Sequence, residues 1–216
     1  PLTLINGVEN YIQAYAATSK DKTLEKYTSV LRENVEELNG LIQEILDFRK
    51  AEDAGFSHTH IRRVSVSSLL RTQFEWFYPL SEQHQIQFKI DAPKELYWNT
   101  DSVYFKKILA NLISNAFKYT EDGGTVRISL HEEENFLVLK VYNTGKGIEE
   151  ADMQNIFDRY RILGTMDNDD NRQNTTRNGL GLFICHSLVQ SLGGKIDIES
   201  EVGQYAEFTV TLPFGI

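Results

Sequence analysis

Three polar residues in the segment NLISNAFKYT have the types and spacing of a phosphate and metal site. Asn111, Asn115 and Lys118 are separated by four and three residues, so on a helix they share one face. An amide oxygen suits Mg²⁺, which prefers oxygen ligands and bridges phosphates, and a neighbouring lysine can meet phosphate charge. Three polar residues can equally form the solvated side of a helix, so the spacing alone does not decide between the two interpretations.

Two glycines in the segment NTGKGI follow a strongly apolar strand that we predict over residues 136–142. Gly145 and Gly147 let the backbone approach a ligand closely or adopt a positive φ. Asn143, at the end of the strand, could hydrogen-bond the edge of an adenine. A tight turn after a strand explains the same glycines, and it is the better interpretation if no other motif matches.

A third motif, NGLGLFI, opens a predicted helix over residues 179–192. The free amides and the positive dipole end of such a helix suit a phosphate at Gly179 and Gly181, although close packing also explains glycine there. The polar run DNDDNRQNTTRN before it has no periodicity. It could close over a nucleotide with Arg172 and Arg177 facing phosphate, or it could be a disordered surface loop.

The elements that must position these motifs follow from hydrophobic periodicity. Further helices are predicted over residues 66–83, 102–119 and 151–157, and strands over 58–66, 86–91, 97–98, 125–131, 195–200 and 205–212. Asp101 or Ser102 caps the helix over 102–119, whose inward face comprises Phe105, Ile108, Leu109, Leu112, Ile113 and Ala116. Helices between mostly antiparallel strands predict an α+β sandwich over residues 55–216.

The first 54 residues are predicted to form a separate helical hairpin. An apolar seam repeats at strict sevens in its second helix, at Leu24, Leu31, Leu38 and Ile45. A hairpin with a continuous apolar stripe cannot bury it alone, so we expect a homodimer through a four-helix bundle. Asn34 falls on the seam, where it fixes register, or at its solvated edge. The chain opens inside a helical pattern without a cap, as if cut from a longer protein.

Composition excludes several classes of protein. The chain has 41% hydrophobic and 25% charged residues, which excludes a disordered, collagen-like or disulfide-built chain, and its net charge of −9 argues against a general nucleic-acid binder. The single Cys185 allows neither an internal disulfide nor a thiolate metal cage. No apolar run approaches the roughly 20 residues that cross a bilayer. We therefore expect a cytoplasmic fragment without direct membrane contact.

The order of the motifs is more specific than any one of them. The chain carries four motifs in the order that is typical of a Bergerat-type ATP-binding fold: NLISNAFKYT, NTGKGI, IFDRYRI and NGLGLFI. From about Ser57 to the end, the chain resembles the ATP-binding domain of sensor histidine kinases. PLTLINGVENYI resembles the continuation of the phosphoaccepting helix of that family. ILDFRKAE is similar to the end of the second helix in hybrid two-component sensors of gut Bacteroidetes.

The resemblance implies a role for each matching residue. Asn115 would hold Mg²⁺ with support from Asn111, Lys118 would approach phosphate, and Asn143 would take the adenine-recognition position. The remaining implied nucleotide contacts are Tyr119, Gly145, Gly147, Ile148, Arg172, Arg177, Gly179, Leu180 and Gly181, and Phe157 would anchor a lid over the nucleotide.

Two departures from the family pattern have consequences. The phosphoaccepting His and its acidic neighbour are absent, so this fragment alone should not autophosphorylate. Asn143 stands where the family usually has Asp; replacing a charged hydrogen bond by a neutral one costs about 1 kcal/mol, or roughly fivefold in ATP affinity.

The resemblance implies the catalytic core of a sensor histidine kinase. It would bind ATP and Mg²⁺ and transfer the γ-phosphate to a histidine, for relay to an aspartate of a response-regulator receiver domain, in a parent protein anchored at the inner membrane. The alternative is a non-catalytic dimeric signalling scaffold with a degraded nucleotide site, of which Asn143 would be the first sign. An ATPase of the gyrase, chaperone or mismatch-repair branch is disfavoured, because those proteins lack the hairpin.

Overall fold

The computed structural model describes Val35, residues 59–158 and residues 181–214. The predicted hairpin, the domain boundary near residue 54 and Asn34 lie outside these residues. So do Arg172, Arg177, Gly179 and Leu180 among the predicted nucleotide contacts.

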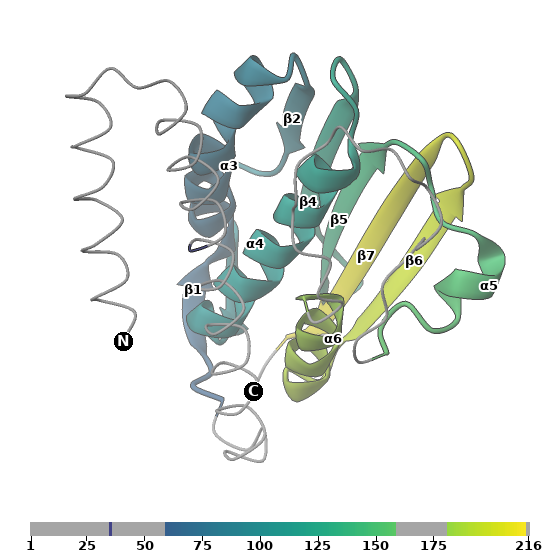
Figure 1. Cartoon of the computed structure of the whole chain (residues 1–216). Coiled ribbons are helices and arrows are strands. Elements are labelled where there is room, and N and C mark those ends of the chain that lie inside the picture. Colours follow the sequence, from purple (N-terminus) through teal and green to yellow (C-terminus); the bar gives the residue numbers. More distant parts are fainter. Residues whose placement is uncertain (1–34, 36–58, 159–180, 215–216) are drawn as a thin grey trace. The chain divides into compact units, whose positions relative to one another are not determined.

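The centre of the described fold is a five-stranded sheet with the strand order β2-β4-β5-β7-β6 (Figure 1). Its strands are β2 (Gln87–Asp91), β4 (Thr125–Glu133), β5 (Phe136–Thr144), β6 (Lys195–Glu201) and β7 (Tyr205–Pro213). β2 runs parallel to β4, and every other neighbouring pair in this sheet is antiparallel. The mostly antiparallel sheet predicted from the sequence is therefore confirmed.

Three helices cover one face of this sheet (Figure 1). They are α3 (Val66–Gln83), α4 (Ser102–Tyr119) and α6 (Gly181–Ser191). A small antiparallel sheet of β1 (Arg62–Ser65) and β3 (Tyr97–Thr100) flanks them, and the short α5 (Glu150–Met153) follows β5. The α+β sandwich expected from the sequence is thus the observed architecture.

Helix α4 is the central element of the core. All six of its predicted inward residues are buried, each with at most 2% of its surface exposed. Asp101 is its N-cap, because the Oδ1 atom accepts hydrogen bonds from the backbone N–H of Val103 at 2.8 Å and of Tyr104 at 3.2 Å. The helix that carries three of the candidate site residues is therefore held along its length and at its start.

Some predicted boundaries were wrong. The strand predicted over 58–66 is limited to Arg62–Ser65, and the helix predicted over 151–157 ends at Met153. β5 continues to Thr144, because β4 supplies pairing partners as far as Asn143 and β7 as far as Thr144. Asn143 is consequently a paired residue within the sheet, opposite Val126 and Ala206, and not a residue that follows the strand.

Candidate nucleotide-binding site

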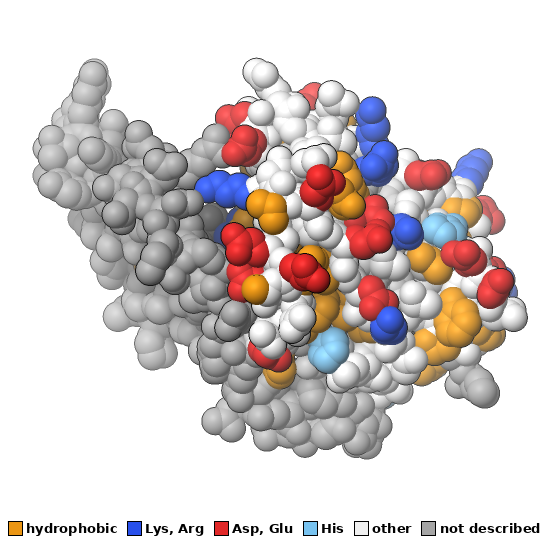
Figure 2. Space-filling model, turned by 90° about the vertical axis from the view of Figure 1, so that its right-hand side faces the viewer, with side chains coloured by type: hydrophobic (Ala, Val, Ile, Leu, Met, Phe, Trp, Pro, Cys, Tyr) orange, Lys and Arg blue, Asp and Glu red, His pale blue; other side chains and the backbone are white. Residues whose placement is uncertain are grey.

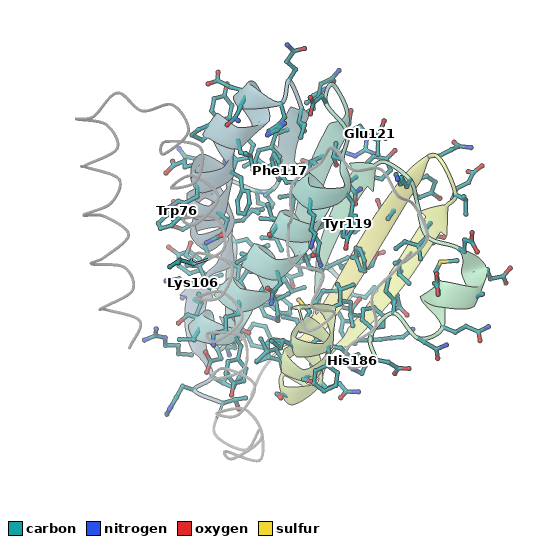
Figure 3. All side chains as sticks on the ribbon, viewed as in Figure 1. Trp76, Lys106, Phe117, Tyr119, Glu121 and His186 are labelled. Carbon is teal, nitrogen blue, oxygen red and sulfur yellow. The ribbon has the colours of Figure 1, made fainter. Side chains whose placement is uncertain are left out.

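The polar residues predicted to share one face of a helix all lie on α4, and one of them, Asn111, lies against the start of α6. Asn111, Asn115 and Lys118 are all partly buried. The Lys118 ammonium nitrogen lies 5.7 Å from the centre of the Tyr119 ring, which stands at the C-terminal end of α4 in Figure 3. The helical spacing predicted for the three residues is confirmed, and it leaves one face of α4 with amide oxygens and a cation.

The start of α6 lies directly against this face. A Cβ added to Gly181 would lie 3.7 Å from Oδ1 and 3.9 Å from Cγ of Asn111. The first turn of α6 contains no acidic residue. No carboxylate of this turn therefore offsets the positive end of the helix dipole. The fold therefore brings together two motifs that are about seventy residues apart in the sequence.

A buried thiol lies beneath this contact. Cys185, one turn after Gly181, is fully buried, and its Sγ donates to the backbone carbonyl oxygen of Ile108 on α4 at 3.7 Å. Burial raises the pKa of Cys185 to about 12, while a hydrogen bond from the Asn111 side chain opposes the rise. No role for Cys185 followed from the sequence, although its spacing of four from Gly181 places both residues on one face of the helix.

Asn143 lies on the helix-covered face of the sheet with only 5% of its surface exposed. It ends the inward row formed by Leu137, Leu139 and Val141, because alternate residues of a strand face the same side. Its Nδ2 donates to the backbone oxygen of Thr144 at 3.1 Å, the one hydrogen bond of this side chain within the described part of the chain. Of the two polar atoms of this amide, the oxygen is therefore the one to which the described residues donate no hydrogen bond.

The loop after β5 requires its two glycines. A Cβ on Gly145 would collide with the backbone oxygen of Tyr119, and a Cβ on Gly147, whose φ is +64°, would collide with the backbone oxygen of Glu201. The Gly145 N–H also donates to the Gln204 oxygen at 3.0 Å. Both glycines therefore let this loop pack closely against the end of α4 and the β6–β7 turn. The close approach predicted for them is thus observed, but toward the protein's own backbone.

Ile148 is held by a side chain that the sequence analysis missed. The Ile148 N–H donates to Oγ of Ser200 at 2.8 Å, and this hydroxyl donates to the backbone oxygen of Tyr205 at 2.6 Å. A lone serine in a strand carries no sequence signal for such a role, because the role depends on the neighbouring loop.

Phe157, predicted to anchor a lid, packs on two elements of the domain. Its ring is stacked on the imidazole of His186, with centroids 5.4 Å apart, and meets Phe208 of β7 edge-on at 6.4 Å. His186 projects from α6 in Figure 3. The segment that follows α5 is thereby attached to the same helix whose start lies against Asn111.

Charge on the surface is mixed. Figure 2 shows acidic and basic side chains interspersed on the side of the molecule that carries β6 and α5. Of the described helices, none has the length and apolar character to cross a membrane.

Comparison with known proteins adds independent observations. Residues 100–216 match the family described as "Histidine kinase-, DNA gyrase B-, and HSP90-like ATPase". The chain is 31% identical over 216 residues to the circadian input-output histidine kinase CikA of Synechococcus elongatus, covering 99% of this chain and 28% of that protein. It is 29% identical over 213 residues to the sensor protein SrrB of Staphylococcus aureus, covering 99% and 36%. The chain thus spans only about a third of these relatives, and they lend no support to a Bacteroidetes source.

Solved structures share the fold. The full-length ShkA crystallised with AMPPNP superposes with a TM-score of 0.76 at 26% identity, covering 99% of this chain and 43% of that one. The catalytic domain of histidine kinase ThkA gives a TM-score of 0.62 at 23% identity, covering 72% of this chain and 97% of that one. ThkA in complex with the response regulator protein TrrA gives 0.70 at 22% identity, covering 99% and 57%.

Proposed function

The chain belongs to the histidine kinase-, DNA gyrase B- and HSP90-like ATPase family, and from that premise we propose that residues 55–216 bind ATP with Mg²⁺ for transfer of the γ-phosphate to a histidine. In the whole protein that phosphate would pass to a response-regulator aspartate. We further propose a homodimer formed through the helical hairpin, a cytoplasmic kinase core and a parent protein anchored at the inner membrane.

The observation that carries the proposal is the contact between Asn111 on α4 and Gly181 at the start of α6. Asn115 lies one turn along α4 from Asn111, on the same face. A metal ligand of the type that Mg²⁺ prefers and a helix start that suits phosphate therefore lie on adjoining elements. This arrangement would suit a nucleoside triphosphate with its metal ion.

The residues present fit a magnesium ion bound through nucleotide. Mg²⁺ usually takes one or two protein oxygens and completes its shell with phosphates and water, so the amide oxygen of Asn115 is a sufficient protein ligand. When bound, the ion would neutralise charge on the phosphates. Lys118, one turn further along α4, would add a positive charge on the same side of the helix.

Asn143 supports an adenine-binding role. With Nδ2 donating to Thr144, the Oδ1 atom is oriented to accept from an exocyclic amino group. Because the amide is neutral, we expect an affinity roughly fivefold below that of an aspartate in the same place. Gly145, Gly147 and Ile148 would then form the wall beside the base, as the family resemblance implies.

Phosphoryl transfer depends mainly on positioning and electrostatic stabilisation, which are the contributions this domain would make. Since the chain spans about a third of its curated relatives, the histidine acceptor and the receiver domain are proposals about the whole protein. The complex of ThkA with the response regulator TrrA and the AMPPNP complex of ShkA support the proposed partner and ligand by analogy.

Isothermal titration with AMPPNP, with and without Mg²⁺, tests the proposal on the 216-residue chain. We expect saturable heat at micromolar to millimolar nucleotide that depends on Mg²⁺. Asn115→Ala should remove the magnesium dependence, whereas Ser114→Ala, an exposed change on the same helix, should leave binding unaltered.

A second candidate function is the non-catalytic dimeric scaffold. The neutral amide of Asn143, in place of the family's usual carboxylate, favours this candidate. No heat at millimolar nucleotide, together with a stable dimer by light scattering, would establish this candidate in place of the kinase.

A further inference from the structure

One hydrogen bond between the loop after β5 and strand β6 depends on a side chain. The Ile148 N–H donates to Oγ of Ser200 at 2.8 Å. The neighbouring bond, from the Gly203 N–H to the Lys146 oxygen at 2.7 Å, joins two backbone groups and involves no side chain. A substitution at position 200 can therefore release residue 148 while the backbone contact between the loop and the β6–β7 turn remains.

The Ser200 hydroxyl is held in one orientation. Its single proton is donated to the backbone oxygen of Tyr205 at 2.6 Å. A hydroxyl has one proton to donate and two lone pairs that accept, so its lone pairs are left for the Ile148 N–H. Alanine at this position would remove both bonds, whereas threonine would keep both.

Ser200 and Asn143 belong to one row across the sheet. Asn143 of β5 is paired with Ala206 of β7, and Ala206 is paired with Ser200 of β6. Residues paired in this way face the same side of a sheet, so Ser200 lies on the helix-covered face with Asn143, two strand spacings or about 10 Å away. The residue between them has only the small side chain of alanine. The amide proposed to recognise adenine and the hydroxyl that holds Ile148 therefore stand at the two ends of one short row.

We propose that Ser200 is a positioning residue for the adenine base, because it holds Ile148 in the wall beside Asn143. The inference rests on the proposed function, in which Asn143 recognises the base and Ile148 forms part of that wall. Ser200 would act through Ile148. Without the hydroxyl, the Ile148 N–H loses the acceptor that the described part of the chain provides for it, and the wall can move away from the base.

Three variants test the positioning role by titration with AMPPNP and Mg²⁺. Ser200→Ala removes both bonds of the hydroxyl, and Ser200→Thr retains them. Ser191→Ala is the matched control: it also removes a serine hydroxyl that donates to a backbone oxygen, that of Ser187 at 2.8 Å, and Ser191 is the last residue of α6. We expect Ser200→Ala to bind roughly fivefold more weakly, the value of one neutral hydrogen bond, and the other two variants to bind within about twofold of the parent chain. Unchanged binding by Ser200→Ala, or equal weakening in the control, would overturn the inference.

A double variant separates positioning of the base from a general loss of stability. Asn143→Ala removes the amide that would recognise the base, so on that background Ser200→Ala should change the affinity for AMPPNP by less than about twofold. A full effect of Ser200→Ala on both backgrounds would mean that the hydroxyl only stabilises the fold, and the inference would be wrong. Thermal unfolding of each chain measures that stability separately.

A second readout needs no nucleotide. In NMR exchange experiments the Ile148 N–H should exchange slowly in the parent chain and in Ser200→Thr, and at least tenfold faster in Ser200→Ala, while the Gly203 N–H exchanges equally in all three. Equal exchange of Ile148 in the parent chain and in Ser200→Ala would overturn the inference, and so would a variant that protects Ile148 but has lost binding.

The two readouts distinguish failure of the inference from failure of the proposed function. If the parent chain binds no AMPPNP, the proposed function fails and a role in positioning adenine fails with it, whatever the exchange of Ile148. If the parent chain binds AMPPNP and Ile148 exchanges equally in the parent chain and in Ser200→Ala, only the inference about Ser200 is overturned. A threonine variant that loses both the protection of Ile148 and the affinity would support the same route through Ile148.

Discussion

Gly147 lies so close to the backbone carbonyl oxygen of Glu201 that no side chain fits between them. Its φ of +64° is also a conformation that residues with a Cβ rarely adopt. The loop after β5 and the β6–β7 turn are therefore packed backbone to backbone, and the Gly203 N–H donates to the Lys146 oxygen at 2.7 Å across the same contact.

Gly147→Ala should destabilise the fold and disturb the proposed adenine wall. Gly203→Ala is the matched control, because Gly203 has a similar φ of +76° but open space around it. We expect the control to lose about 1 kcal/mol of unfolding free energy from backbone strain and Gly147→Ala to lose at least 2 kcal/mol more. Urea denaturation measures both, and equal losses would show that the contact with Glu201 is easily relaxed.

The buried thiol predicts a specific alkaline instability. Burial raises the pKa of Cys185 from its ordinary value near 9 to about 12, so between these values the unfolded chain binds fewer protons than the folded chain. The unfolding free energy is therefore unaffected by this thiol below about pH 9, and it falls as the pH rises from 9 towards 12. Between about pH 8 and pH 10.5 the parent chain should lose about 2 kcal/mol more unfolding free energy than Cys185→Val.

The difference between the two chains removes the contribution of other alkaline groups. Tyr104, whose pKa is raised first by burial and then by the charge of Asp101, titrates in both. Parallel pH profiles for the parent chain and the valine variant would mean that Cys185 opens to solvent without unfolding.

Asn143→Asp should lower the unfolding free energy and raise the affinity for ATP. A carboxylate at this buried position cannot donate to the Thr144 oxygen and would face it instead, which we expect to cost about 1–3 kcal/mol of unfolding free energy. The same carboxylate accepts a charged hydrogen bond from an adenine amino group, so ATP should bind up to roughly fivefold more tightly. Calorimetry with ATP and with GTP checks this, and a variant that gains as much affinity for GTP would argue against adenine recognition at this position.

The cap of α4 offers a graded test of stability. Asp101→Ala removes the oxygen bonded to Val103 and Tyr104 and the second oxygen, which accepts from the His60 N–H at 2.9 Å. We expect it to lose about 1–2 kcal/mol of unfolding free energy. Asp101→Asn retains one acceptor and should lose less, and Asp91→Ala, an exposed change on β2, should lose within about 0.5 kcal/mol. Thermal unfolding should rank the three variants in this order.

Local pattern was enough to predict α3 and α4 with the bounds observed, because a 3.6-residue period over eighteen residues, with Asp101 before α4, leaves little freedom. The α+β class and the glycine positions followed from the same kind of signal. Strand ends were less predictable: β5 extends to Thr144 because β4 and β7 flank it, and those partners come from distant parts of the sequence.

The sequence by itself determined which residues carry chemical groups and which helix or strand presents them, because periodicity and capping act over a few neighbouring residues. Only the tertiary structure decided that Asn111 meets Gly181, that the Cys185 thiol of α6 donates to the Ile108 carbonyl oxygen of α4, and that the Asn143 amide donates to Thr144. The physical reason is that the orientation of an amide depends on which donors and acceptors reach its two ends. Those partners are set by the packing of α4 against α6 and of β5 within its sheet.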